Sequence, residues 1–265
     1  MTDVDDVYSK KEIVDFWTKD KPRVIGDIVG RSEAVRLLEE ELRGLEAKDI
    51  LDAGCGTGYV SRILARKGAN VVGIDGSIDM IRRAEDEQRS KRGSKDCTSI
   101  SYHCNDITNI LSKHLNNIFD GVLSTGVLIH NDMAVNSAFL KESYRLLKPE
   151  GVAVISVTHP SLFLPTSPAR NGKPSWVSYT PLENKPYNES QRFTEHYMDI
   201  DGTVIHTPLW HHTIESYLNA VADSGLTLIK VNEPLLKEEH LLIPEWGTDH
   251  GYPAFFQMVL KKVKR

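Results

Sequence analysis

The heptapeptide Asp52-Ala53-Gly54-Cys55-Gly56-Thr57-Gly58 combines glycines with a carboxylate. Glycine permits tight turns and lets a ligand approach the backbone N–H groups that open the next helix. The third glycine follows the second by two residues, where a dinucleotide loop would place it three residues later. A carboxylate at this place suits a pyrophosphate poorly and suits a positive charge well. The loop therefore predicts a ligand with a cationic group, such as an amino acid ammonium.

Acidic side chains also follow the next two predicted strands. Asp75 lies 23 residues after Asp52, where a carboxylate can accept hydrogen bonds from both hydroxyls of a ribose. Asp106 can accept from an adenine amino group while Ile107 packs on the ring, although Asp106 could also form a turn. Thr125 and Gly126 end a fourth strand. Ligands of open parallel sheets bind at the carboxyl ends of strands, so these residues predict a nucleoside site there.

The elements that must position these residues alternate between strand and helix. Apolar runs at 49–54, 70–75, 99–106, 119–126 and 152–159 predict strands, and 60–68, 77–91 and 136–151 predict helices. This alternation is typical of right-handed βαβ units and of an α/β fold with a parallel sheet. Residues 1–48 carry helical periodicity and predict an N-terminal helical cap before a main domain at 49–265.

Residues 160–208 interrupt this rhythm. The segment is rich in proline and aromatic residues and has no helical periodicity, which favours an ordered lid inserted after the fifth strand. We expect Trp176, Tyr197 and the nearby Trp210 to shape an apolar acceptor pocket, with a small core of the lid itself as the alternative.

The composition narrows the class of protein. A formal charge of −5 argues against a nucleic-acid binder, and no apolar run is long enough to span a membrane. The N-terminus lacks the apolar region of a signal peptide. Cys55, Cys97 and Cys104 are too widely spaced for a zinc site or a disulfide framework. We therefore expect a cytoplasmic protein with no metal.

Five motifs together resemble the class I S-adenosylmethionine-dependent methyltransferases, in particular the ubiquinone-type small-molecule enzymes: DAGCGTG at 52–58, GID at 73–75, NDI at 105–107, FDGVLSTGVL at 119–128 and LLKPEG at 146–151. The resemblance implies a Rossmann-like, doubly wound, seven-stranded sheet. Its last strand, 252–263, would run antiparallel beside 226–234. The cofactor implied is S-adenosyl-L-methionine.

The resemblance also implies roles for individual residues. Asp52 and the loop glycines Gly54, Gly56 and Gly58 would face the methionine moiety, and Thr125 with Gly126 would line the same end. Asp75 would hold the ribose, Gly76 would belong to the same cofactor site, and Asp106 with Ile107 would hold the adenine edge. Met80 would flank the adenine, although its spacing from Ile81 and Ala84 also fits ordinary core packing.

The predicted activity is transfer of a methyl group to an oxygen or nitrogen of a small-molecule acceptor. His130 and His159 are the candidate general bases because both follow strands at the ligand-binding edge, although either could be structural. The alternatives are a methyltransferase for RNA or protein and a non-catalytic sensor of S-adenosylmethionine. A nicotinamide dehydrogenase is disfavoured by the glycine spacing. A homodimer is compatible with the sequence.

Overall fold

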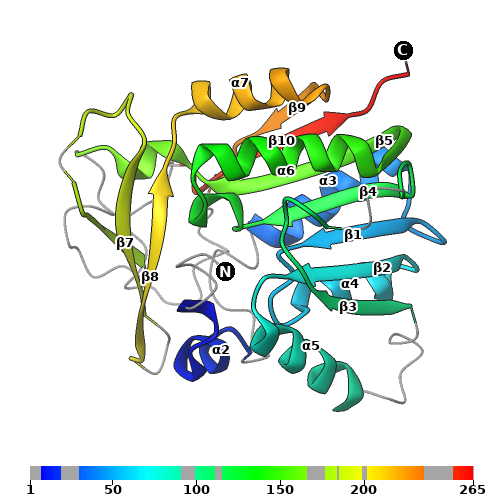
Figure 1. The fold of residues 1–265 in the computed structure, drawn as a ribbon, viewed down its shortest axis with the longest axis horizontal. Helices are drawn as coiled ribbons and strands as arrows, with labels where there is room; N and C mark the ends of the chain where they lie inside the picture. Colours follow the sequence, from blue (N-terminus) through cyan, green and yellow to red (C-terminus); the bar gives the residue numbers. More distant parts are fainter. Residues whose placement is uncertain are drawn as a thin grey trace.

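The computed structural model describes residues 7–18, 30–90, 99–110, 115–165, 177–183, 185–198, 202–235 and 253–264 (Figure 1). A seven-stranded sheet with the order β3-β2-β1-β4-β5-β10-β9 lies at the centre. Its strands are β1 (Asp49–Ala53), β2 (Asn70–Asp75), β3 (Ile100–Cys104), β4 (Phe119–Thr125), β5 (Leu147–Thr158), β9 (Thr227–Asn232) and β10 (Phe255–Lys261).

The strand directions confirm the predicted fold class. Strands β1 to β5 pair in parallel, whereas β10 runs antiparallel between β5 and β9. The last strand, β10, is shorter than the predicted 252–263, but it lies beside β9 as predicted, and its other neighbour is β5. The boundary between the helix predicted at 136–151 and the strand that follows it also differs from the prediction. Strand β5 begins at Leu147, which pairs with Phe119 of β4. The preceding helix therefore ends at Leu146 and does not continue through Pro149, which cannot extend a helix.

Helices cover both faces of the sheet. On one face, α3 (Ser32–Leu42) and α4 (Tyr59–Arg66) bury apolar side chains against β1, β4 and β5. On the other face, α6 (Met133–Leu146) and α7 (Ile214–Ser224) pack on the larger core cluster. The remaining described helices are α2 (Lys11–Thr18), α5 (Ile78–Ser90) and the short 3-10 turns η3 (Leu128–His130) and η4 (Pro160–Phe163).

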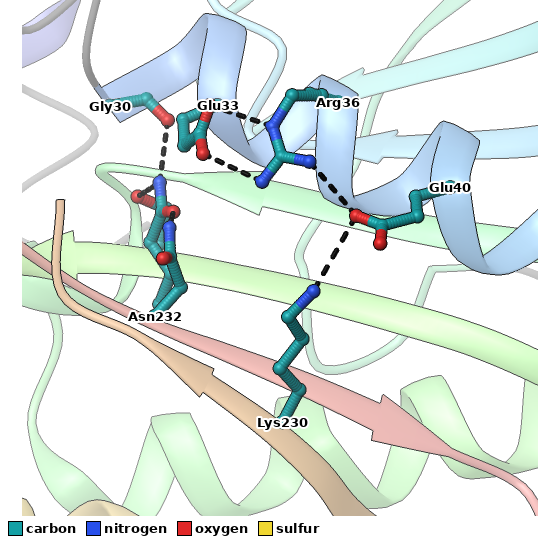
Figure 2. A network of polar contacts seen from close by, with 8 residues as sticks. Gly30, Glu33, Arg36, Glu40, Lys230 and Asn232 are labelled. Atoms are coloured by element: carbon teal, nitrogen blue, oxygen red, sulfur yellow. Dashed lines mark hydrogen bonds and ion pairs between the residues drawn. The ribbon is translucent and has the colours of Figure 1, made fainter.

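A polar network joins α3 to the C-terminal strands (Figure 2). Lys230 of β9 forms an ion pair with Glu40, which also binds Arg36. The buried Gln257 side chain of β10 donates to the carbonyl of Gly30 at 2.8 Å and accepts from Asn232. The exposed ion pairs stabilise little, but the buried amide fixes where α3 begins. Helix α3 thus belongs to the main core, and only α2 of the described N-terminal helices lies at the edge of the sheet.

The predicted lid forms a sheet of its own beside the carboxyl ends of β4 and β5 (Figure 1). It is antiparallel and consists of β6 (Val177–Pro181), β7 (Gln191–Met198) and β8 (Val204–His211). Pro208 lies inside β8, where it is tolerated because β8 has a neighbour on one side only. This sheet therefore ends at His211, three residues beyond the end at 208 that the sequence predicts for the lid, and its closure over a ligand stays a prediction.

Candidate functional site

In the glycine loop that follows β1, every second residue from Gly54 to Gly58 has a left-handed backbone conformation. Gly54, Gly56 and Gly58 have φ angles of 73°, 52° and 78°, a region that glycine adopts readily. A Cβ at Gly54 would meet Val127 at 2.1 Å, and one at Gly58 would meet the Tyr102 hydroxyl at 2.3 Å. At Gly56 a Cβ would meet nothing within 4 Å. Two of these glycines thus serve packing, whereas Gly56 faces open space.

Asp75 joins the loop to the end of β2. Its Oδ2 accepts from the Gly56 N–H at 2.8 Å, and its Oδ1 accepts from the Ser77 N–H at 2.9 Å. A carboxylate has about four lone-pair sites, so these bonds leave capacity for further donors. The side chain is only partly buried, and Gly76 lies beside it. The structure therefore brings Asp75 next to the open glycine of the loop.

Asp52 lies beneath the loop and is 1% exposed. Its Oδ2 accepts from the Ser61 hydroxyl at 2.5 Å. Burial raises the pKa of Asp52 to about 6, while the Ser61 hydrogen bond and the charge of Arg31 act in the opposite direction. The guanidinium of Arg31 lies 5.3 Å from the Trp17 ring centroid and 5.9 Å from that of Tyr59. Sequence reasoning missed this cation at the loop.

The adenine-side residues occupy the next strand ends. Met80 of α5 is buried against α2. Asp106 accepts from the backbone and hydroxyl of Thr108, both at 2.7 Å, so it also forms the turn that the sequence allowed. Ile107 packs at the margin of the main core.

Gly126 continues from Thr125 at the end of β4. It has a φ of 71°, and a Cβ there would meet nothing within 4 Å. Its N–H donates to the carbonyl of Ser156 at 2.9 Å, which ties the turn to β5. Gly126 is therefore a second position where the backbone faces open space.

The N-terminal segment covers this site from one side. The Thr57 hydroxyl donates to the carbonyl of Trp17 at 2.9 Å, and Ser77 donates to the carbonyl of Tyr8 at 3.1 Å. The hydroxyl of Ser9 also lies 3.1 Å from that of Ser77. The N-terminal segment is thus attached to the loop after β1 through Trp17 of α2, and to the turn after β2 through Tyr8 and Ser9. The helical periodicity at 1–48 predicted the helix but not this location.

His130 is partly buried, and both of its ring nitrogens have partners in the protein. Its Nδ1 lies 2.8 Å from the carbonyl of Pro208, which can only accept, so Nδ1 carries the proton. Its Nε2 then accepts from the Tyr8 hydroxyl at 2.9 Å. Burial lowers the pKa of His130 to about 4. His130 is therefore neutral near pH 7 and positions Tyr8; its predicted role as a base remains a prediction.

His159 follows β5 and caps η4. Its Nδ1 accepts from the Ser161 N–H at 3.1 Å, and its Nε2 lies 2.8 Å from a carboxylate oxygen of Glu233. Both ring nitrogens thus have protein partners, and the side chain is 7% exposed. His159 thus caps η4 and contacts Glu233. Its role as a general base stays a prediction, and no contact between His159 and His130 is found among the described residues.

The three predicted acceptor residues are not equivalent. Tyr197 of β7 packs with Phe16 and Trp17 of α2, with ring centroids 6.1 Å and 5.4 Å apart. Trp210 lies over Arg192 and stacks on His212, and its position in β8 faces the opposite side of the lid sheet from Leu209. Trp176 lies outside the described residues.

A carboxylate that the sequence reasoning did not select lies on the lid. Glu195 of β7 is 0% exposed, and its Oε2 accepts from the Thr207 hydroxyl at 2.9 Å. Burial raises the pKa of Glu195 to about 7, against the opposing influence of the Thr207 and Tyr197 hydroxyls. A strongly perturbed, buried acid beside a ligand-binding edge is a candidate functional group.

Two further properties bear on the class of site. In the part of the chain that the structure describes, no three His, Cys, Asp or Glu side chains gather as metal ligands. Across the same described ranges, no helix is both long and apolar enough to cross a bilayer.

The comparisons with known proteins agree with this geometry. A family model described as a methyltransferase domain matches residues 51–155, which include the loop and strands β2 to β4. The ubiquinone biosynthesis O-methyltransferase of Bradyrhizobium diazoefficiens is 34% identical over 130 residues, which cover 48% of this chain and 47% of that protein. The cypemycin N-terminal methyltransferase of a Streptomyces species is 32% identical over 123 residues, covering 46% of each.

The chain spans about half the length of the curated relatives it matches. The likeness to a solved structure is more extensive. The CcbJ methyltransferase of Streptomyces caelestis superposes with a TM-score of 0.64 at 14% identity, covering 97% of this chain and 98% of that one. At this identity the likeness establishes the fold.

Proposed function

The chain belongs to the class I S-adenosylmethionine-dependent methyltransferases, and on that premise we propose that it transfers a methyl group to an oxygen or nitrogen of a small-molecule acceptor. The observation that carries the proposal is the pairing of Asp75 with Gly56. A carboxylate able to hold ribose hydroxyls lies 2.8 Å from the N–H of the loop glycine that faces open space.

The residues present fit S-adenosylmethionine. Gly56 and Gly126 both expose their backbones where no atom would meet a Cβ within 4 Å, so a ligand can approach them closely. Asp75 would hold the ribose and Asp106 with Ile107 the adenine edge. Arg31 supplies a positive charge for the carboxylate of the methionine moiety, and Asp52 a negative charge near its ammonium.

When bound, the cofactor supplies a methyl group on a positively charged sulfur. The protein's contribution to such a displacement is to hold the acceptor atom in line with that methyl carbon and to exclude water. The lid sheet lies beside the carboxyl ends of β4 and β5, and α2 lies beside α5 and the lid sheet, so the two can enclose a ligand at this edge from different sides (Figure 1). A base is needed only where the acceptor atom carries a proton.

The acceptor is proposed to be small. The formal charge of −5 opposes RNA, whose binding depends on neutralising phosphates. The curated relatives methylate different atoms, because one is named as an O-methyltransferase and the other as an N-terminal methyltransferase. Oxygen and nitrogen acceptors therefore both stay within the proposal, as does a cytoplasmic location.

The test combines calorimetry with a turnover assay. The protein should bind S-adenosylhomocysteine, and methylated products should appear by mass spectrometry when a panel of phenols, alcohols, amines and carboxylates is incubated with S-adenosylmethionine. Absence of S-adenosylhomocysteine binding would contradict the proposal. Binding of S-adenosylhomocysteine without turnover of any acceptor would instead favour a sensor. Methylation of RNA or protein, with no turnover of the small molecules, would show that the acceptor is a macromolecule.

A further inference from the structure

The face of the lid sheet that carries Glu195 is largely apolar and aromatic, and its other buried polar side chains are Gln191, Thr207 and His211. In the register of the sheet, Tyr179 of β6 pairs with Glu195, and Glu195 pairs with Thr207 of β8. Side chains two residues apart on a strand share a face, so Phe193 and Tyr197 flank Glu195 on that side. Of these residues, only Glu195 has a carboxyl group. A charge in the middle of an apolar face is costly unless a partner compensates it.

The carboxyl of Glu195 is only half satisfied. Oε2 accepts from Thr207, whereas Oε1 is buried and has no hydrogen-bond partner of normal geometry. The Tyr197 hydroxyl is close enough to lower the pKa of Glu195, but burial outweighs it. Among the described residues, no basic side chain forms an ion pair with Glu195. An unpaired, buried carboxylate oxygen loses hydration that nothing in the protein replaces. Oε1 of Glu195 can therefore accept a hydrogen bond from a donor on a bound ligand.

Phenol hydroxyls connect this carboxyl to the cofactor edge. The charge of Glu195 helps to raise the pKa values of Tyr8, Tyr179 and Tyr197, although burial is the larger cause for each. Asp75 also raises the pKa of Tyr8, so Tyr8 lies within reach of both carboxylates. The Thr158 hydroxyl at the end of β5 lowers the pKa of Tyr179 by hydrogen bonding. Tyr179, the register neighbour of Glu195, therefore lies at the carboxyl end of β5, which is part of the edge where the methyl group would be presented.

We propose that Glu195 is the acceptor-binding carboxylate and that the acceptor is an amine, whose nitrogen it holds through Oε1 within the ring cluster of Tyr8, Tyr179 and Tyr197. This inference rests on the proposed methyltransferase function. It narrows the acceptor atom from oxygen or nitrogen to nitrogen. It also makes Glu195, on β7, the group that accepts the proton of the acceptor.

An ammonium group matches this cluster better than a hydroxyl does. It donates a charge-assisted hydrogen bond to the free oxygen and supplies the missing positive charge. The faces of phenol rings also attract cations, whereas they gain nothing comparable from a neutral alcohol. The three phenols stay protonated near pH 7, because burial raises each of their pKa values. They therefore add no competing negative charge.

The reaction balances with Glu195 as the base. The acceptor ammonium gives one proton to the Glu195 carboxylate, which frees the nitrogen lone pair. That lone pair forms the new N–C bond while the C–S bond of the sulfonium breaks and its electron pair stays on sulfur. The products are a methylated ammonium ion, the neutral thioether and a carboxylic acid on Glu195, which then releases its proton to water.

The test compares amines with alcohols of matched shape. Benzylamine, phenethylamine and cyclohexylamine are titrated by calorimetry into the protein saturated with S-adenosylhomocysteine at pH 8, alongside benzyl alcohol, 2-phenylethanol and cyclohexanol. We expect at least one amine to bind tenfold or more tightly than its alcohol. Lowering the pH from 8 to 5.5 should weaken amine binding about thirtyfold, because the Glu195 pKa is about 7 and the ionised fraction of its carboxyl falls by about that factor.

Glu195→Gln should remove both the amine preference and its pH dependence while leaving S-adenosylhomocysteine affinity unchanged. Glu189→Gln is the matched control, since Glu189 lies exposed in the same lid. A wild-type protein that binds no amine, or binds amines no better than alcohols, overturns the proposal, as does a preference that survives in Glu195→Gln. Loss of S-adenosylhomocysteine binding by the wild type would instead contradict the methyltransferase function itself.

Discussion

The Tyr8 hydroxyl donates to Nε2 of His130 at 2.9 Å, across 122 positions of sequence. The contact joins the N-terminal segment to the turn that follows β4, and the carbonyl of Pro208 in the lid completes it on the other ring nitrogen. Three separate parts of the chain therefore meet at one neutral imidazole. Because Tyr8 also lies near Glu195 and Asp75, this contact connects the lid with the cofactor edge.

Tyr8→Phe should destabilise the protein by about 1–3 kcal/mol, because Nε2 of the buried His130 loses its donor. Urea unfolding followed by tryptophan fluorescence measures this change. Tyr144→Phe on α6 is the control, as its ring lies over Lys262 rather than at the site. Equal unfolding free energies for both variants would show that the hydroxyl of Tyr8 contributes nothing to stability.

Asp75→Ala should weaken S-adenosylhomocysteine binding by about 1.5–3 kcal/mol, the scale of charge-assisted hydrogen bonds to a ligand. This corresponds to a rise in Kd of roughly 10- to 150-fold. The N–H groups of Gly56 and Ser77 also lose their acceptor, so part of the loss comes from a less ordered loop. Calorimetry on the folded variant measures it, and an unchanged Kd would remove Asp75 from the ribose site.

Alanine at Gly56 and at Gly54 should have different consequences. At Gly56 an added Cβ has free space, so the variant should fold with a strain of about 1–2 kcal/mol yet lose cofactor affinity, because the methyl occupies the ligand's approach. At Gly54 the Cβ would meet Val127 at 2.1 Å, so the main loss should be stability. Thermal unfolding and calorimetry separate the two effects; normal affinity in folded Gly56→Ala would contradict this arrangement.

Glu195→Gln should stabilise the protein at pH 8 but not at pH 4.5. Burial raises the pKa of Glu195 from 4.5 to about 7, so its favourable contribution is complete below pH 4.5 and is lost as the pH rises through 7. The difference is about 3 kcal/mol at pH 8. Urea unfolding at both pH values tests it, with Glu189→Gln expected to show no such pH dependence. A wild type as stable as Glu195→Gln at pH 8 would indicate that the carboxyl is compensated in the free protein.

The parts of the site that sequence predicted are local in the chain. The glycine loop, Asp75 and the strand order follow from motifs and periodicity within β1 to β5, and the antiparallel final strand follows from the family resemblance. Tyr8 and Arg31 could not be placed in this way, because each acts far from its own position in the sequence. Glu195 was missed for a different reason: among the alternating residues of β7, an isolated glutamate looks like a solvent-facing residue until the register shows which side is buried.

The position of β10 between β5 and β9 has a consequence for how the chain is made. Strand β9 leaves the ribosome first, yet its neighbour in the sheet is β10, and β10 in turn lies against β5. Strands β5 and β10 are far apart in the sequence, and contacts between such distant segments form slowly compared with local contacts. A nascent chain stalled before Phe255 would therefore carry β9 with an unpaired edge, and the last third of the sheet would assemble only after residues 255–261 had emerged from the exit tunnel.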